Sequence, residues 1–317
     1  MSDTTSKKPR LQSEINAELQ EVAASARRQR ERIRQKIGKL DRSSVSSSKK
    51  GVPCPNSVLQ FSNPTFHTKL PFPFVDGVVP ERFKVEGKGG LENWVYMGRE
   101  KFTELLDKCE ELRKDSKHSE VIIYGPSGNG KSHLLAALVC YLAAREQKVV
   151  YIPDCWDLIQ DPVQYMMSAM LFAWADDKSK QEMIMALETQ EEIYQFFRTQ
   201  KDIIFIIDQL NALEKEKDDD ECTANEKAQL RRWLGRLWAR SRQKAILSLS
   251  ANNHSILNRV SRQSSSEIMY VNGGLTRVSL RSNKSFVKMG ASNSDLEGDG
   301  PVVEADEKGP TRRLHEG

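Results

Sequence analysis

The middle of the chain alternates short apolar runs with stretches of helical periodicity. Apolar runs without polar alternation are typical of parallel strands covered on both faces. They occupy residues 120–125, 148–154, 202–208 and 244–250. Apolar positions at three- and four-residue steps predict helices over residues 99–114, 131–147, 161–177, 190–200 and 222–243. This order predicts an α/β fold, an open parallel sheet with flanking helices and right-handed crossovers.

The N-terminal part predicts one helix over residues 13–40, with Ser13 as its N-cap and a thin apolar stripe. The stripe is broken at Gln29 and consists of Ile15, Leu19, Val22, Ala26, Ile33, Ile37 and Leu40. Because the stripe is thin, we expect a solvated helix tethered outside the domain. A short coiled coil and a nucleic-acid-binding arm are the alternatives.

The next segment is rich in serine and proline, which predicts a linker. Its aromatic residues, in "FPFV" and "NWVYMG", are expected to pack on the domain surface, so the boundary lies between Phe61 and Gly98. The sequence therefore divides into a polar basic extension with one helix (1–50), a linker (51–95), a folded domain (96–275) and a tail (276–317). The tail is rich in Gly, Ser and charge, and we expect disorder at both extensions.

Composition narrows the class of protein. The 317 residues are 38% hydrophobic and 29% charged, with a net charge of +4 that conceals basic runs such as "RRWLGRLWARSRQK". Five scattered cysteines form no C-x-x-C pair, so neither a zinc site nor a disulfide framework is indicated. No signal peptide or membrane span is evident. We expect a soluble intracellular protein, cytoplasmic or nuclear, and "KKPR" at 7–10 hints at nuclear entry.

The stretch "GPSGNGKS" between the first apolar strand and its helix fits G-x-x-x-x-G-K-[ST]. Glycines allow consecutive N–H groups to converge on phosphate oxygens, and the helix N-terminus adds partial positive charge. Lys131 is expected to reach the β- and γ-phosphates, and the Ser132 hydroxyl to ligate Mg²⁺. The predicted nucleotide-binding residues are Gly125, Pro126, Ser127, Gly128, Asn129, Gly130, Lys131, Ser132 and His133.

A second motif, "IIFIIDQLNAL", places Asp208 at the end of a buried strand. There it is expected to hold Mg²⁺ together with Ser132. Gln209 follows where a glutamate would accept the proton of an attacking water; an amide can only orient that water. Slow or conditional hydrolysis is therefore expected. Glu214 could swing in as the base, although a surface position on the next helix is favoured.

Two further stretches carry polar groups that could reach the phosphates. "SLSANN" ends the last strand, and Asn252, with Ser250 and Asn253 nearby, would emerge beside Asp208 if that strand inserts between the two motif strands. An amide there could contact the γ-phosphate, but asparagine is also common in ordinary turns.

The helix predicted over residues 222–243 carries four arginines, for which a solvated basic face is favoured over an arginine finger. They are Arg231, Arg232, Arg236 and Arg240, opposite a buried side of Trp233, Leu234, Leu237 and Trp238. No guanine-specific N-K-x-D follows, so ATP is the expected nucleotide.

Together, "IIYGPSGNGKSHLL", "VVYIPDC", "FIIDQLNAL", "LSANN" and "YVNGGL" resemble the NTPase region of Crinkler-type effector proteins and the related retrotransposon hot spot proteins, over about residues 95–275. The resemblance implies an ATPase of the additional-strand (AAA-like) type in proteins that act inside host cells. Lys131 and Ser132 then match the phosphate and magnesium residues, Asp208 the second magnesium position and Gln209 its unusual partner. A truncated or divergent member is expected, because no Leu-Phe-Leu-Ala-Lys leader and no effector domain are evident.

The sequence thus predicts an Mg²⁺-dependent ATP-binding protein with weak turnover, in which Lys131, Asp208, Gln209 and Asn252 act on the phosphates. Such a protein could be a regulatory switch with a protein partner or oligomer. One alternative is an interaction or nucleic-acid-associated protein whose nucleotide is structural and whose basic helices bind the partner. Another is a kinase for a small acceptor.

Overall fold

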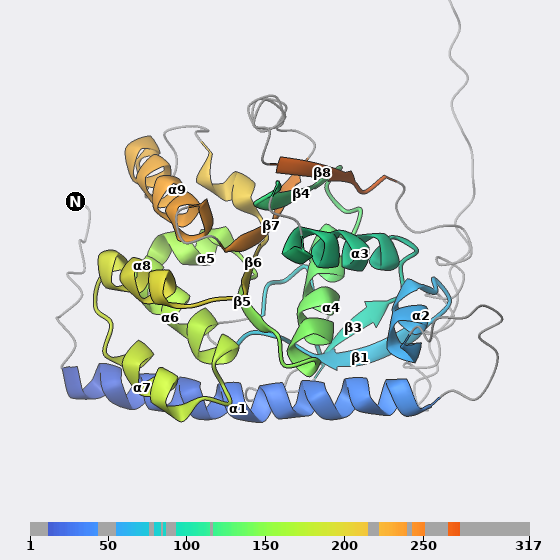
Figure 1. The fold of residues 1–317 in the computed structure, drawn as a ribbon, viewed down its shortest axis with the longest axis horizontal. Coiled ribbons are helices and arrows are strands. Elements are labelled where there is room, and N and C mark those ends of the chain that lie inside the picture. Colours follow the sequence, from blue (N-terminus) through green and yellow to red (C-terminus); the bar gives the residue numbers. More distant parts are fainter. Residues whose placement is uncertain are drawn as a thin grey trace, which may run out of the picture.

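The central sheet is the largest feature of the computed structural model, which describes residues 12–43, 55–75, 79–83, 85–86, 93–114, 117–214, 222–239, 243–250 and 266–272. Within these residues it contains five parallel strands in the order β5-β6-β7-β4-β8 (Figure 1). They are β4 (Glu120–Gly125), β5 (Lys148–Ile152), β6 (Ile203–Ile207), β7 (Lys244–Ser250) and β8 (Ser266–Tyr270). The predicted α/β sheet is therefore confirmed.

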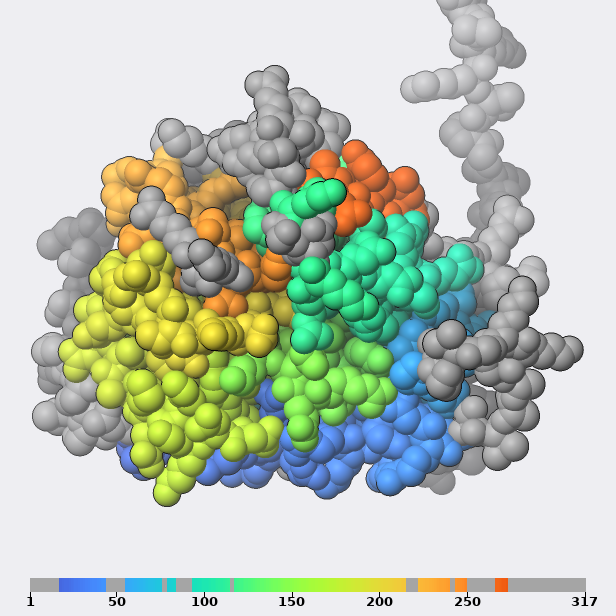
Figure 2. Space-filling view, viewed as in Figure 1, coloured from blue at the N-terminus to red at the C-terminus, as the bar shows by residue number. Residues whose placement is uncertain are grey.

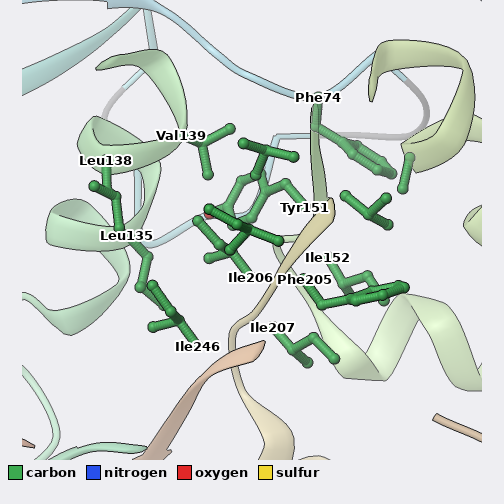
Figure 3. Close-up of a cluster of buried hydrophobic side chains, with 14 of the residues drawn as sticks. Phe74, Leu135, Leu138, Val139, Tyr151, Ile152, Phe205, Ile206, Ile207 and Ile246 are labelled. Atoms are coloured by element: carbon green, nitrogen blue, oxygen red, sulfur yellow. The ribbon is translucent and has the colours of Figure 1, made fainter. Parts of the chain in front are cut away.

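The sheet is apolar on both sides because helices cover both faces. Tyr151, Ile206 and Ile246 lie in one register across β5, β6 and β7. They point toward Leu135 and other apolar residues of the helix that follows β4, whereas side chains such as Phe205 and Ile207 lie on the other side (Figure 3). Every residue of β6 is buried. Burial on both faces explains why these strands lack polar alternation.

The strands are connected by α3 (Lys101–Lys114), α4 (Lys131–Ala144), α5 (Cys155–Gln160), α6 (Pro162–Ala173), α7 (Lys178–Met185), α8 (Gln190–Thr199), the short 3₁₀ helix η1 (Leu210–Leu213) and α9 (Ala224–Ala239). Of these, α3, α4, α6, α8 and α9 begin and end within four residues of the predicted positions, whereas α5, α7 and η1 were not predicted. Side chains accept hydrogen bonds from the first turns of α5 to α8, namely those of Asp154, Asp161, Asp177 and Thr189. These caps satisfy N–H groups that a helix leaves free.

Strand β7 lies between β4 and β6, the two strands that carry the sequence motifs. This is the inserted position that defines the additional-strand type of sheet, as expected. Because parallel strands end at the same edge of the sheet, the phosphate-loop motif and Asp208 come together there. Edge strand β8 pairs with β4 along its whole length, from Ser266 opposite Glu120 to Tyr270 opposite Tyr124.

The segment expected to be a linker forms helix α2 (Asn56–Ser62) and a small antiparallel sheet with the order β1-β3-β2. Its strands are β1 (His67–Pro71), β2 (Val85–Glu86) and β3 (Asn93–Met97). The prolines are compatible with this structure because Pro55 precedes α2 and Pro71 ends an edge strand. Phe61, Trp94 and Tyr96 are fully buried against the larger domain. The linker prediction was therefore wrong for this segment.

The N-terminal helix α1 (Gln12–Arg42) lies along the lower edge of the molecule, where it contacts α4 and α6 (Figures 1 and 2). The expectation of a helix outside the domain was wrong, because polar groups complete its buried stripe. Gln29 donates to the Phe72 carbonyl at 2.7 Å, and Arg30 donates to the carbonyls of Phe172 and Ala173 at the end of α6. A guanidinium stabilises a helix C-terminus of this kind. The predicted tail, 276–317, lies outside the described residues.

Candidate nucleotide site

The loop between β4 and α4 has the backbone conformation that the glycine pattern predicts. Gly128 and Gly130 adopt φ values of 80° and 78°, in the left-handed region that favours glycine. An added Cβ at Gly130 would lie 2.2 Å from the Arg99 guanidinium carbon. Arg99, from the turn between β3 and α3, therefore packs directly against the loop.

Gly125 ends β4, and the residues after β8 leave no space for a side chain there. An added Cβ would lie 2.3 Å from the Val271 carbonyl oxygen. The Val271 N–H donates to the Tyr124 carbonyl at 2.8 Å, and the Asn129 amide donates to the Val271 carbonyl at 3.2 Å. The loop is thus bonded to the end of the edge strand.

Lys131 begins α4 and folds back over the loop. Its ammonium donates to the carbonyls of Gly125 at 2.7 Å and Pro126 at 2.8 Å. Burial lowers the pKa of Lys131, and the nearby negative charge of Asp208 partly offsets this effect. The Asp208 carboxylate is therefore close enough to Lys131 to influence its charge, as expected if the two motifs lie at the same edge of the sheet.

Asp208 is fully buried directly after β6. Burial raises its pKa, while Arg82, hydrogen bonds from the Ser132 and Ser248 hydroxyls and the Gln209 N–H counteract the rise. The Gln209 N–H donates to Asp208 Oδ1 at 2.9 Å. Asp208 Oδ2 is buried without a hydrogen-bond partner in the described structure. A carboxylate oxygen of this kind beside a serine hydroxyl suits Mg²⁺, so the two residues fit the predicted ion.

Gln209 is held in an unusual backbone conformation, with φ 56° and ψ 34°, at the start of η1. A non-glycine residue in this region is uncommon and carries local strain. The turn places the backbone N–H of Gln209 against Asp208, and the residue as a whole is half-buried. Asn252 and Asn253 lie outside the described residues, so their predicted approach to the site stays a prediction.

Sequence reasoning missed Ser248, which is 2% exposed in the middle of β7. Its hydroxyl hydrogen bonds to Asp208. A single serine inside an otherwise apolar strand was the available signal, because a buried hydroxyl requires a partner.

Arg82 was also missed, and its guanidinium connects the ends of two neighbouring strands. One Nη lies 2.7 Å from Asp154 Oδ2, and the other lies 3.5 Å from Asp208 Oδ2 and donates to the Pro153 carbonyl. Asp154 follows β5 and caps α5, whereas Asp208 follows β6. No local pattern around Arg82 indicates this contact across the fold.

His133, predicted as part of the binding loop, packs against aromatic residues of the N-terminal segment. Its ring centroid lies 4.9 Å from that of Phe83 and 5.5 Å from that of Trp94. Burial lowers the pKa of His133 to about 4, with smaller contributions from Arg99 and Arg82. The imidazole is therefore neutral near pH 7 and joins α4 to the small sheet.

The basic residues of α9 are mostly engaged with nearby groups. Arg231 pairs with Glu214 at 3.0 Å, so Glu214 is an ion-pair partner in this structure and not a free base. Arg232 donates to Ala228 of its own helix, and Arg236 pairs with Glu191 at 3.2 Å. Arg240 lies outside the described residues. The predicted buried side of α9 is confirmed at Trp233, Leu234, Leu237 and Trp238.

No curated protein matches the chain. A solved structure, AMPPCP-bound DnaA from Aquifex aeolicus, is similar at 15% identity and a TM-score of 0.33, over 62% of this chain. This similarity spans 52% of that DnaA chain, about half of its length. No helix among the described residues is long and apolar enough to cross a membrane.

A family model agrees with the motifs and the sheet. The NACHT domain model matches residues 119–281, just over half of the chain. This range begins next to β4 and includes the phosphate loop, β6 with Asp208, and both β7 and β8. The chain therefore belongs to the NACHT family of P-loop NTPases, whose domains bind nucleotide.

Proposed function

We propose that the protein binds ATP with Mg²⁺ and hydrolyses it slowly or only under certain conditions, as a regulatory switch. The observation that carries this proposal is the meeting of the phosphate loop with buried Asp208, whose Oδ2 lacks a hydrogen-bond partner in the described structure. A buried carboxylate oxygen that accepts no hydrogen bond and faces a guanidinium only at 3.5 Å is poorly satisfied, which supports a bound metal at this point.

Each site residue has a chemical role in this proposal. Loop N–H groups and the Lys131 ammonium bind the phosphates, for which Lys131 exchanges its present bonds to the Gly125 and Pro126 carbonyls. Ser132 and Asp208 would hold Mg²⁺, which supplies charge neutralisation to the phosphates when bound. The Gln209 amide orients the attacking water but cannot take its proton. Slow turnover follows from that difference.

The test combines ATP calorimetry in Mg²⁺ with phosphate release over hours. Wild type is expected to bind ATP and to release phosphate slowly, and Lys131→Ala to lose both. Gln209→Glu is expected to release phosphate faster, because a carboxylate can accept the proton. Binding without phosphate release in wild type and Gln209→Glu would instead favour a structural nucleotide, and no binding by wild type would contradict the proposal.

We also propose, on Asp208-Gln209-x-Asn211-Ala212, a relation to the Crinkler-type and retrotransposon hot spot proteins. An effector-like role inside a host cell, in cytoplasm or nucleus, is part of this proposal. A protein partner or further copies of the chain would receive the signal of the switch. Light scattering with and without Mg²⁺ and ATP tests the second possibility, since assembly predicts a nucleotide-dependent increase in mass.

A further inference from the structure

The chain carries a carboxylate just after β5 and another just after β6, and one guanidinium contacts both. Arg82 contacts Asp154 Oδ2 at 2.7 Å and Asp208 Oδ2 at 3.5 Å. Burial and these two carboxylates act in opposite directions on the pKa of Arg82, and the net result is a rise. Arg82 therefore carries its positive charge at the point where the proposed magnesium ligand Asp208 lies.

The position of Arg82 is fixed by its neighbour in the sequence. Phe83 is only 2% exposed. Its ring centroid lies 4.9 Å from Phe72, 5.3 Å from Trp94 and 4.9 Å from His133 of α4. The aromatic cluster of these four residues anchors the backbone next to Arg82 against the helix that follows the phosphate loop. The guanidinium thus reaches the site from a packed segment, and not from a free surface chain.

The contact of Arg82 with Asp208 has a consequence for a metal ion. The oxygen that Arg82 faces, Asp208 Oδ2, is the one without a hydrogen-bond partner in the described structure, and therefore the one available to a cation. A guanidinium and a divalent cation at the same carboxylate oxygen repel each other strongly in a buried site. Asp154, which is closer to Arg82, can retain the guanidinium after it leaves Asp208.

We propose that Arg82 is a built-in counter-cation that competes with Mg²⁺ for Asp208. Binding of Mg²⁺ with nucleotide then requires Arg82 to withdraw from Asp208 toward Asp154. Residues 79–83 thereby become the part of the N-terminal segment that responds to occupation of the site. This inference rests on the proposed function, because Asp208 is the proposed metal ligand.

The main experiment measures how much Mg²⁺ the protein needs to bind a non-hydrolysable ATP analogue, by calorimetry at a series of Mg²⁺ concentrations. Arg82→Ala is expected to lower the half-saturating Mg²⁺ concentration about fivefold, equivalent to about 1 kcal/mol, because it removes the ion pair that competes with the metal at Asp208. Arg82→Lys, which retains the charge, is expected to stay near wild type. Arg232→Ala is the matched control, because it removes the same side chain from the exposed face of α9 and should change nothing.

A further variant and a second measurement distinguish a failure of the metal competition from a failure of the proposed function. If Arg82→Ala fails to fold, Arg82→Gln retains hydrogen bonding without the charge and takes its place. Mg²⁺ alone, without nucleotide, is expected to raise the melting temperature of the Arg82 variant more than that of wild type. A wild type that binds no nucleotide contradicts the proposed function, whereas an unchanged or higher Mg²⁺ requirement in the neutral variants overturns the competition.

Discussion

At the residue scale, charged groups of the nucleotide site lie close to a cluster of aromatic side chains. The charge of Asp208 raises the pKa of both Lys131 and Arg82 against the effect of burial, while His133 lies against the rings of Phe83 and Trp94. A charge on this imidazole would have to form in an apolar environment that already contains two arginines nearby. Protonation of His133 is thus coupled to the packing of the small sheet on α4.

This coupling predicts a pH dependence of stability. The folded-state pKa of His133 is about 4, below the ordinary value of 6.5, so the unfolded chain binds more protons between these values. The contribution of His133 to the unfolding free energy is therefore complete above about pH 6.5 and is lost progressively as the pH falls toward 4. Denaturant unfolding of wild type and His133→Gln across this range checks it: the variant should lose less stability on acidification, and parallel curves would contradict the assignment.

The individual residues also show what a sequence can reveal about a site. Lys131 and Asp208 were predictable because each stands in a local pattern, a glycine-rich loop or the end of an apolar run. Ser248 left a weak signal and Arg82 none, because the function of Arg82 depends on a contact with residues far along the chain. A local sequence pattern indicates the chemical role of a residue, but it does not show which residue far along the chain will contact it.

At the element scale, α1 was expected to lie outside the domain, but in the structure it forms part of the hydrophobic core. Its apolar stripe packs on α4 and α6, and residues such as Ile33 and Ile37 are fully buried. Sequence periodicity identified the buried positions from Leu19 to Leu40. It could not show that Gln29 would bond to the Phe72 carbonyl just after β1, or Arg30 to the end of α6, and so complete the buried face. The small sheet was missed because its strands are short and lie in a segment rich in proline, one of which, Pro71, ends β1.

The packing of α1 predicts a large effect of truncating its buried face. Ile37→Ala is expected to lower the free energy of unfolding by about 3 kcal/mol, because it leaves a cavity against the domain. Gln35→Ala, on the exposed face of the same helix, is expected to change it by less than about 0.5 kcal/mol. Denaturant titration measures both. Equal small effects would mean that α1 does not stabilise the domain.

At the scale of the whole molecule, β7 lies between β4 and β6, as the expected additional-strand type of sheet requires, whereas edge strand β8 was not predicted. The connectivity rules of parallel sheets leave few alternatives once these strands are recognised, which is why the fold was predictable from the sequence. The N-terminal segment follows no such rule. Its contribution to the site, through Arg82, Phe83 and Arg99, became evident only from the tertiary structure.

A folded domain of this size should report ligand binding through its melting temperature. ATP with Mg²⁺ at about a hundred times the dissociation constant is expected to stabilise the native state by about 2.7 kcal/mol. That corresponds to an increase of about 5 °C or more in the melting temperature. Lys131→Ala should show no increase, which differential scanning calorimetry can establish. A similar increase in that variant would mean that the nucleotide binds elsewhere.

The bonds between Val271 and the phosphate loop also determine how the chain would respond to mechanical load. Val271 is bonded to Tyr124 and Asn129, and its carbonyl lies directly against Gly125. Tension applied to the chain at Asn272 would therefore be transmitted to β4 and to the loop together. We expect such tension to act first on the bond between the Asn129 amide and the Val271 carbonyl, so the end of β8 is mechanically linked to the phosphate loop.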